Sequence, residues 1–289
     1  MNRSLLRLVR IFGAGNPVIH KVIEYYGSAA DACSELDKGD IRFLPDKQLQ
    51  EMVSFVSYDK IDKVISWCEK RDIKIVNIYE KEYPRMLKEI YNPPVALFYC
   101  GNLSCLENSP ITAVGAREIT TYIEKLAFRV CRDLSKSGMT IVSGMARGVD
   151  SVCHNACVYE ENPTVGVLAC GISYDYPKGS GIMRRKIILN GGAYISELFP
   201  EAEPTREYFK GRNRILAGLS KGTIVFQAGK GSGSLITADY ALEEGRDVFC
   251  VPPPRLSDRR YEGVSPYLED GAIPLFNHDD VLEFYRNNY

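Results

Sequence analysis

The run Ile111-Thr112-Ala113-Val114-Gly115-Ala116-Arg117 sets the pattern for most of this chain, because a short apolar run ends in a glycine and a cation. From here to about residue 251, short apolar runs alternate with longer amphipathic segments. The runs predict strands at 111–114, 140–142, 164–169, 193–196, 223–226 and 247–251, and the segments between them predict helices at about 120–136, 148–160, 182–190, 204–220 and 234–244. Such alternation is typical of βαβ units with right-handed crossovers. We therefore expect an α/β fold with an extended Rossmann-like, doubly wound, mainly parallel sheet.

The flanking segments complete the expected architecture. Residues 1–58 are mostly helical by pattern, with the break Gly13-Ala14-Gly15-Asn16-Pro17 between two helices. This arrangement resembles helix-hairpin-helix and sterile-alpha-motif-like (SAM-like) modules, whose glycine turn can meet a DNA phosphate, but an ordinary helical hairpin that packs on the main domain fits as well. We expect a small all-helical SAM-like domain at 1–58 and an extended Rossmann domain at 59–289. In the latter, a helix at 60–71 and strands at 74–78 and 95–99 precede the alternation, and a short strand at 273–276 and a final helix follow it.

Composition excludes several classes of protein. The 289 residues include 36 Lys+Arg and 37 Asp+Glu, a net charge of −1, so any polyanion site must be local. A hydrophobic content of 45% excludes a disordered chain, and no apolar run approaches the roughly 18 residues of a membrane span. The arginine-interrupted N-terminus is unlike a secretory signal, so we expect a cytoplasmic protein with no membrane contact. The nine cysteines contain no C-x-x-C pair and are expected to be reduced and buried.

Two strand-to-helix turns contain candidate anion contacts, and ligands of doubly wound sheets bind at such turns. The first, Gly115-Ala116-Arg117, lacks a G-x-G-x-x-G pattern and offers a guanidinium that can grip a phosphate. The second, Ser143-Gly144-Met145-Ala146-Arg147-Gly148, can turn its amides toward an anion at a helix N-terminus. Plainer interpretations stay open: a surface arginine, and glycines that let a helix pack closely on the sheet.

Three later segments add cations, aromatics and hydroxyls. Tyr176 and Lys178 follow one strand, and the densest basic cluster, 206–214, contains Tyr208 and Phe209. The turn 228–237 holds Ser232, Gly233 and Ser234, but its lysine is not placed as in a Walker A motif. Basic side chains beside aromatics are typical of sites for a phosphate backbone with unstacked bases, although a solvated helix face has the same composition.

Other chemistries find little support. Asp150 and His154 lie one helical turn apart and could form an acid/base pair, but a favourable interaction with the helix dipole explains Asp150. Cys153 and Cys157 supply only two ligands on one helix face, so a zinc site is incomplete. We expect no metal and no cofactor.

Taken in order, these motifs resemble the DprA/Smf family of DNA-processing proteins. The resemblance covers about residues 60–280 and rests on Tyr83-Pro84, Asn92-Pro93-Pro94, Val114–Arg117, Ser143–Asp150 with His154, Tyr176-Pro177, Ser196-Glu197, Arg212–Leu219, Gly231–Ser234 with Thr237-Ala238, and Gly271-Ala272. It implies a non-catalytic protein that binds and protects incoming single-stranded DNA, loads the RecA recombinase in natural transformation, and acts as a homodimer. The expected nucleic-acid-binding residues are Gly115, Arg117, Ser143, Gly144, Ala146, Arg147, Gly148, Lys178, Tyr208, Phe209, Arg212, Asn213, Arg214, Ser232, Gly233 and Ser234.

This chain departs from the family pattern in places. Pro252-Pro253-Pro254 stands where the family usually has a Pro-Gly pair, and Gly263-Val264-Ser265 lacks the usual asparagine. The chain ends at Tyr289, so we expect no C-terminal winged helix. An alternative function is that of a nucleoside-monophosphate phosphoribohydrolase, which would use Asp150 or His154 as its base. Under the DNA-binding hypothesis, the net charge of −1 is the sum of a basic groove and of acidic residues elsewhere on the protein.

Overall fold

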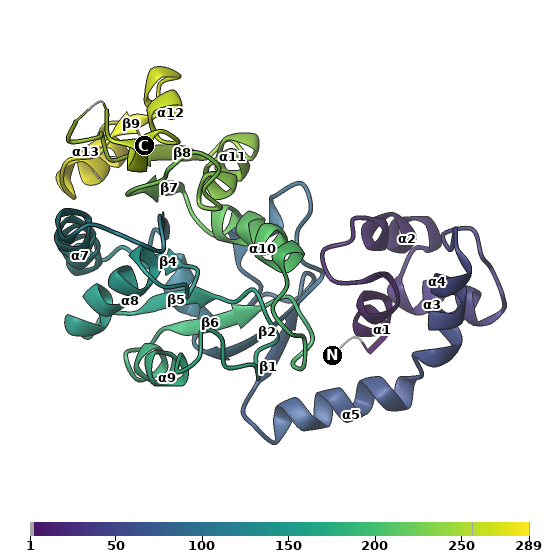
Figure 1. The fold of residues 1–289 in the computed structure, drawn as a ribbon. Coiled ribbons are helices and arrows are strands. Elements are labelled where there is room, and N and C mark those ends of the chain that lie inside the picture. The colour runs from purple at the N-terminus through teal and green to yellow at the C-terminus, as the bar shows by residue number, and fades with distance from the viewer. Residues whose placement is uncertain (1–2, 256, 289) are drawn as a thin grey trace.

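The computed structural model describes residues 3–255 and 257–288, and its central feature is one sheet with helices on both faces (Figure 1). The described residues form nine strands in the order β1-β2-β6-β5-β4-β3-β7-β8-β9. Their bounds are β1 Lys74–Asn77, β2 Ala96–Gly101, β3 Ile111–Val114, β4 Ile141–Ser143, β5 Thr164–Val167, β6 Ala193–Ser196, β7 Gly222–Val225, β8 Asp247–Cys250 and β9 Ile273–Pro274. In the sheet order β6-β5-β4-β3-β7-β8-β9, each strand is parallel to its neighbours. Strand β2 runs antiparallel to both β6 and β1.

The strand order identifies the topological switch point. From β3 the chain builds outward through β4, β5 and β6, then returns to the other side of β3 and builds through β7, β8 and β9. The loops after β3 and β7 therefore lead away from each other, and the carboxyl ends of these two strands flank a crevice. The expected doubly wound, mainly parallel sheet is confirmed.

The helices divide between the two faces of the sheet. Their bounds are α6 Arg85–Lys88, α7 Thr121–Lys136, α8 Val149–Tyr159, α9 Gly181–Leu189, α10 Arg206–Gly218, α11 Leu235–Glu243, α12 Ser265–Glu269 and α13 Asp279–Asn288. On one face Ile111 and Ala113 pack among apolar residues of α7, α8 and α13, and on the other Val114 and Val142 pack against α10 and α11. Because both faces are covered, β3, β5 and β7 are buried at every position and appear in the sequence as continuous apolar runs.

The N-terminal part is all-helical, as expected. It comprises α1 Arg3–Phe12, α2 Val18–Tyr26, α3 Ala29–Asp37, α4 Lys47–Phe55 and α5 Tyr58–Glu69. Ser28 and Asp46 cap α3 and α4 by accepting backbone N–H bonds, which fixes where these helices begin. Ile61 of α5 belongs to the same apolar cluster as α1 and as Phe98 of β2, so the helical part shares a core with the sheet. The division into domains at residue 58 stays a prediction.

The glycine turn between α1 and α2 is docked against the sheet domain. Gly15 O accepts a hydrogen bond from Asn92 Nδ2 (2.8 Å), and a Cβ added at Gly15 would lie 3.4 Å from both Arg214 Nη2 and Glu197 Oε2. The turn therefore packs against the sheet domain. This contact favours the interpretation as an ordinary helical hairpin over that of a turn that binds a DNA phosphate.

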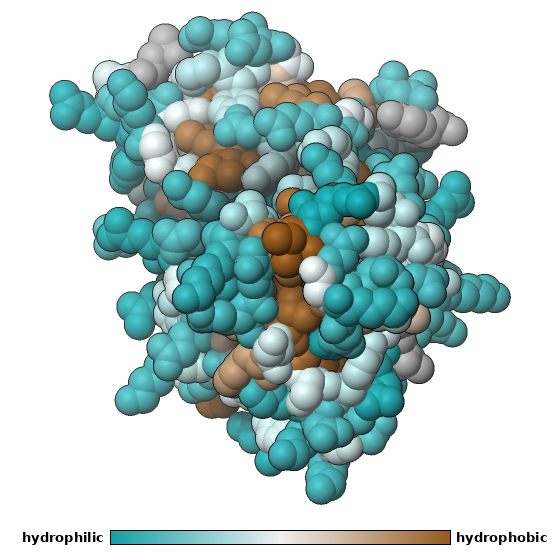
Figure 2. All heavy atoms as spheres, turned by 90° about the vertical axis from the view of Figure 1, so that its right-hand side faces the viewer, coloured by the Kyte–Doolittle hydropathy of each residue, from teal (hydrophilic) through white to brown (hydrophobic). Residues whose placement is uncertain are grey.

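The predicted bounds agree with the structure to within about two residues, and differences of two residues occur at both helix and strand ends. The run 164–169 forms a strand only to Val167, and that at 273–276 only at Ile273–Pro274. All nine cysteines are free and buried, as expected. Figure 2 looks onto the side where the helical part lies and shows a mostly hydrophilic surface with apolar side chains in a central hollow. Among the described helices, none has the length and apolar character needed to cross a membrane.

Candidate nucleic-acid interface

A pocket of about 220 Å³ lies at the switch point, between the turns that follow β3 and β7 and one face of α10. We call it the switch-point pocket. Its lining residues are Val114, Gly115, Arg117, Ala146, Asp150, Phe209, Arg212, Asn213, Leu216, Ser232, Gly233, Ser234 and Thr237. Four segments far apart in the sequence thus meet at one place, and all four had been singled out as candidate turns or clusters. Val114, Asp150, Leu216 and Thr237 also line the pocket, although they are not among the nucleic-acid-binding residues expected from the sequence.

The first two turns pack directly on each other. A Cβ at Gly115 would lie 2.5 Å from Val149 Cγ2, and a Cβ at Gly148, whose φ is +76°, would lie 2.3 Å from Ala116 O. The N–H of Val149 donates to Ala116 O (3.2 Å), and that of Ala146 to Asp150 Oδ2 (3.2 Å). Because these N–H groups donate to acceptors within the protein, they are not available to an anion. Close packing of the two turns therefore explains why a glycine stands at position 148.

Within the second turn, the predicted residues separate into buried and accessible ones. Ser143 is fully buried and donates its hydroxyl to Ala113 O (2.6 Å), and Gly144 is also buried. Ala146 lines the switch-point pocket, and Arg147 is exposed beside it without being part of the lining. Only the second half of this turn can therefore meet a ligand directly.

Arg212 lies beneath the pocket, clamped by backbone carbonyls. Its Nη1 donates to Gly144 O (2.6 Å) and to Val167 O, and the residue is only 7% exposed. Burial lowers the pKa of Arg212 to about 10, against the opposing effect of Asp150, and burial raises the pKa of Asp150 against the effect of Arg212. A Cβ at Gly144 would lie 2.5 Å from Arg212 Nη2 and 2.6 Å from Asp150 Oδ2, so only glycine fits here.

Arg214 does not line the pocket, in contrast to its predicted place in the interface. Its guanidinium forms a bidentate ion pair with Glu197 (2.9 and 2.6 Å) and also donates to Asn92 O (3.0 Å) and Gly211 O (3.0 Å). Burial opposes the charge of Arg214, but Glu197 outweighs burial, and the pKa of Arg214 is raised. With its donors engaged inside the protein, Arg214 is a structural cation.

Phe209 organises the rim of the pocket. The Arg117 guanidinium carbon lies 5.1 Å from the centre of the Phe209 ring, that of Arg212 lies at 6.0 Å, and Tyr176 packs edge-on at 5.5 Å. Cation–π attraction thus holds Arg117 over a half-buried ring. Arg117 lines the pocket, is exposed and has no carboxylate within ion-pair distance in the described parts of the chain, so its charge is available to a ligand.

The turn 228–237 completes the lining of the pocket. Asn213 Nδ2 donates to Gly233 O (2.9 Å), and the hydroxyls of Ser232 and Ser234 are 2.8 Å apart. The Thr237 hydroxyl, 1% exposed, has no hydrogen-bond partner among the described residues. Hydroxyl groups thus line the same pocket as the Arg117 and Arg212 side chains, which suits an oxyanion.

Tyr208 and Lys178 also lie outside the lining, as Ser143, Gly144, Arg147, Gly148 and Arg214 do. Tyr208, half-buried, is capped at its N–H by Thr205 at the start of α10. Lys178 is exposed and lies in a loop that Arg184 holds in place. The buried Arg184 guanidinium donates to the carbonyl oxygens of Ile172, Tyr174 and Tyr176. Both can contact a ligand that extends beyond the pocket.

The possible acid/base pair does not assemble. His154 is fully buried, and its Nδ1 donates to Thr164 Oγ1 (2.9 Å), which itself donates to Ile141 O. Burial, reinforced by Arg212, lowers the pKa of His154 to about 4. Asp150 lines the switch-point pocket whereas His154 does not. In the described ranges, no three His, Cys, Asp or Glu side chains are grouped to hold a metal ion.

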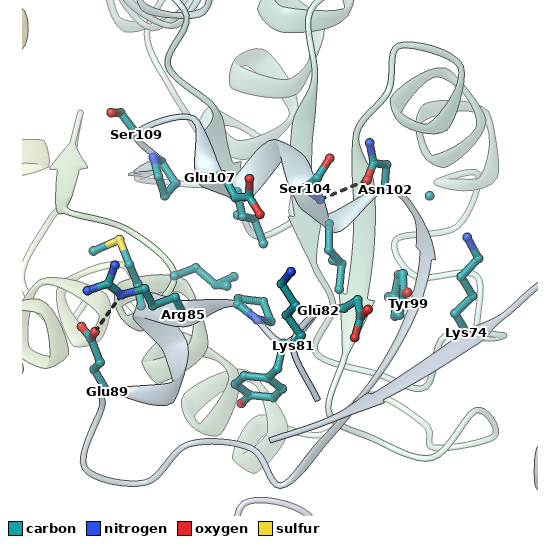
Figure 3. A pocket seen from close by; sticks show the side chains of 18 of the residues that line it. Lys74, Lys81, Glu82, Arg85, Glu89, Tyr99, Asn102, Ser104, Glu107 and Ser109 are labelled. Carbon is teal, nitrogen blue, oxygen red and sulfur yellow. Dashed lines mark hydrogen bonds and ion pairs between the residues drawn. The ribbon is translucent and has the colours of Figure 1, made fainter. Parts of the chain in front are cut away.

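A larger hollow of about 780 Å³ opens at the opposite edge of the sheet, near the amino ends of β3 and β7 (Figure 3). Its lining mixes charges: Lys81 and Glu82 point into it, and Arg85 is 3.6 Å from Glu89. It lies away from the carboxyl ends of the parallel strands, where ligands of doubly wound sheets bind, so it is a weaker candidate for a polyanion site.

Comparisons with known proteins identify the family to which this chain is similar. The model of the family described as DNA recombination-mediator protein A matches residues 74–286. The chain is 36% identical to DNA processing protein DprA of Streptococcus pneumoniae (93% of each chain), 36% to DprA of Bacillus subtilis (78% of this chain, 76% of the relative) and 34% to Protein Smf of Escherichia coli (82% and 63%).

Two solved structures resemble the fold over most of this chain. That of DprA from S. pneumoniae matches with a TM-score of 0.84 and 32% identity, over 98% of this chain and 97% of that one. That of DprA from Helicobacter pylori, described for its single-stranded DNA binding mode, matches with a TM-score of 0.66 and 26% identity, over 75% and 97%.

Proposed function

The chain belongs to the DNA recombination-mediator protein A family, and from this premise we propose that it binds single-stranded DNA with a phosphate in the switch-point pocket. The observation that carries the proposal is the meeting of Arg117, Phe209 and Ser232 at the topological switch point. A guanidinium and hydroxyls suit a phosphate, and an aromatic ring suits an unstacked base.

The shape of the pocket favours one strand over two. Arg117, Arg212, Asn213 and Ser234 surround a space of about 220 Å³. A flexible single strand can direct one phosphate into such a space and turn its bases toward Phe209. A duplex keeps its bases stacked and presents its phosphates on a rigid outer surface, so we expect weaker binding.

We propose further that the protein is a non-catalytic cytoplasmic homodimer that shields single-stranded DNA from nucleases and loads RecA recombinase onto it. The family resemblance supports these finer roles. The burial of His154 supports the absence of catalysis, because a general base must reach its substrate. Sedimentation velocity tests the homodimer, and RecA assembly on oligonucleotides precoated with single-strand binding protein tests loading.

A titration of fluorescent oligo(dT) and of a matched duplex at two salt concentrations tests the proposed function. We expect tighter binding to the single strand and, for Arg117→Ala, a salt slope smaller by about 0.7, the value for one phosphate contact on a single strand. Arg85→Ala is the control, because its side chain is 93% exposed at the opposite edge (Figure 3). Equal binding and equal slopes for both variants and the parent protein would overturn the proposal.

The same preparation tests the enzymatic alternative. A phosphoribohydrolase would release free base from AMP, and Asp150→Ala would abolish that release. We expect no release above background, because His154 is buried outside the pocket and Asp150 Oδ2 is engaged with the Ala146 N–H. Release that depends on Asp150 would replace the binding hypothesis with an enzymatic one.

A further inference from the structure

We propose that residues 257–263, which we call the Arg259 loop, form with Lys230 and Tyr122 a second contact surface for single-stranded DNA, continuous with the switch-point pocket. This inference rests on the proposed function and extends the proposed path of the DNA strand beyond the switch-point pocket. The loop follows Pro252-Pro253-Pro254, the place where this sequence departs from the family pattern.

The Arg259 loop lies directly on the turn that closes the pocket. The N–H of Gly263 donates to Ala228 O (3.1 Å), and a Cβ at Gly229 would lie 3.4 Å from Arg259 O. The N–H of Ser232 in turn donates to Gly229 O (3.1 Å), and Ser232 lines the pocket. One hydrogen-bonded turn therefore separates the pocket from the loop, and exposed Lys230 lies between them.

The charge of this surface is positive and available. The Arg259 side chain is 91% exposed, with Glu262 at 3.7 Å as its nearest carboxylate partner. Arg260 satisfies the other carboxylate of the loop, since its Nε and Nη2 donate to Asp258 Oδ1 (2.8 Å) and Oδ2 (2.7 Å). With Lys230 added, cations exceed carboxylates, and an extended cation such as Arg259 can reach a passing phosphate.

An exposed aromatic side chain accompanies these cations. Tyr122, at the start of α7, is 54% exposed. Its neighbour Ile123 packs in the same buried cluster as Tyr261 of the Arg259 loop, so the start of α7 lies against this loop. Exposed aromatic rings and exposed cations together form the surfaces on which successive bases of a single strand stack. The pocket would thus hold one phosphate while this surface holds the nucleotides that follow.

Oligonucleotide length separates the two contacts. An oligo(dT) of roughly 6 nucleotides can fill the pocket, whereas one of about 20 can also reach the loop, in line with site sizes of single-strand binders. We expect Lys230→Ala/Arg259→Ala to lower affinity for the long oligonucleotide, with a salt slope smaller by about 1.4, the value for two phosphate contacts. Affinity for the short oligonucleotide should stay unchanged, and Lys230→Arg/Arg259→Lys should retain the parent slope on both.

The matched control is Lys81→Ala/Arg85→Ala at the opposite edge of the sheet, where both residues are labelled in Figure 3. Arg85 is as exposed as Arg259 and lies 3.6 Å from its own glutamate, so the control removes equal charge from a similar setting. It should change neither oligonucleotide's binding. Because all four side chains are exposed, thermal unfolding should be the same for both double variants.

The outcomes distinguish this inference from the function on which it rests. If Arg117→Ala weakens both oligonucleotides but the loop variant binds the long one like the parent, the second surface is refuted and the proposed function stands. An equal loss on both lengths from the loop variant would also refute it, since the loop would then act on the pocket. If neither variant changes binding, both proposals fail. For Tyr122→Ala, we expect a loss on long oligo(dT) that is absent on an abasic strand of equal length.

Discussion

Arg214 and Glu197 form a bidentate ion pair, with N–O distances of 2.9 and 2.6 Å, at the place where α10 meets the glycine turn of the helical part. Their side chains are 8% and 10% exposed. Arg214 is two residues after Arg212 on α10, and Arg212 lines the switch-point pocket. One helix thus contributes one arginine to the candidate interface and one to the junction with the helical part.

Replacing Arg214 by alanine should therefore destabilise the protein. Removing one partner of a buried ion pair leaves an uncompensated charge and costs about 3–5 kcal/mol. Urea unfolding measures this loss, and Arg214→Met/Glu197→Leu, which removes both charges, should recover most of it. A variant Arg214→Ala of parental stability that has lost DNA affinity would contradict this role.

Replacing Gly144 by alanine should disturb Arg212 and Asp150. The new Cβ would lie within 2.6 Å of both side chains, and overpacking of this kind costs about 1–3 kcal/mol. We expect lower stability together with weaker binding of single-stranded DNA. Gly211→Ala in α10 is the control: no atom lies within 4 Å of its added Cβ, and alanine in a helix should raise stability by up to about 1 kcal/mol. Equal unfolding midpoints for the two variants would show that Gly144 is not under this constraint.

Besides the proposed base contact, Phe209 should act on DNA binding partly through Arg117. Because the guanidinium lies 5.1 Å from the ring centre, Phe209→Leu removes the cation–π contact while keeping an apolar side chain. We expect the variant to lose affinity for oligo(dT) together with part of the Arg117 salt slope. In a double-mutant cycle with Arg117→Ala the two losses should not add, with a coupling energy of about 0.5–1 kcal/mol. Full additivity would mean that Phe209 contacts DNA independently of Arg117.

Burial of His154 should make stability depend on pH. Its pKa falls from 6.5 to about 4 in the folded protein, so the unfolded chain binds the proton at higher pH than the folded one. The stability is therefore complete above about pH 6.5 and is lost as the pH falls toward 4, by about 3 kcal/mol in total.

The comparison of the parent with His154→Asn isolates this contribution, because the raised pKa of Asp150 acts in the opposite sense in both proteins. Denaturant unfolding at intervals from pH 7.5 to 4.5 should show the parent losing stability faster than the variant. Parallel curves would mean that His154 is not held neutral.

Much of the fold could be predicted, because the periodicity that defines it is local. The run at 111–114 is a buried strand as predicted, and the long helices after it begin and end close to their predicted positions. The turns after these strands were also predicted, since glycines, serines and arginines between an apolar run and a helix mark the carboxyl edge of a parallel sheet. Their meeting in one pocket follows from the strand order, which places β3 and β7 side by side at the switch point and comes from the structure.

The roles of the cations in 206–214 could not be read in this way. In the sequence Arg206, Lys210, Arg212 and Arg214 form one basic cluster, whereas in the structure Arg212 is clamped by Gly144 O and Val167 O and Arg214 by Glu197. The partners come from residues 144, 167 and 197, and their distance in sequence hides them. The amino-acid order thus fixes which segments are strands, helices and turns, because those preferences act between neighbours. Which charges face solvent and which are consumed inside depends on contacts that exist only once distant segments have packed together.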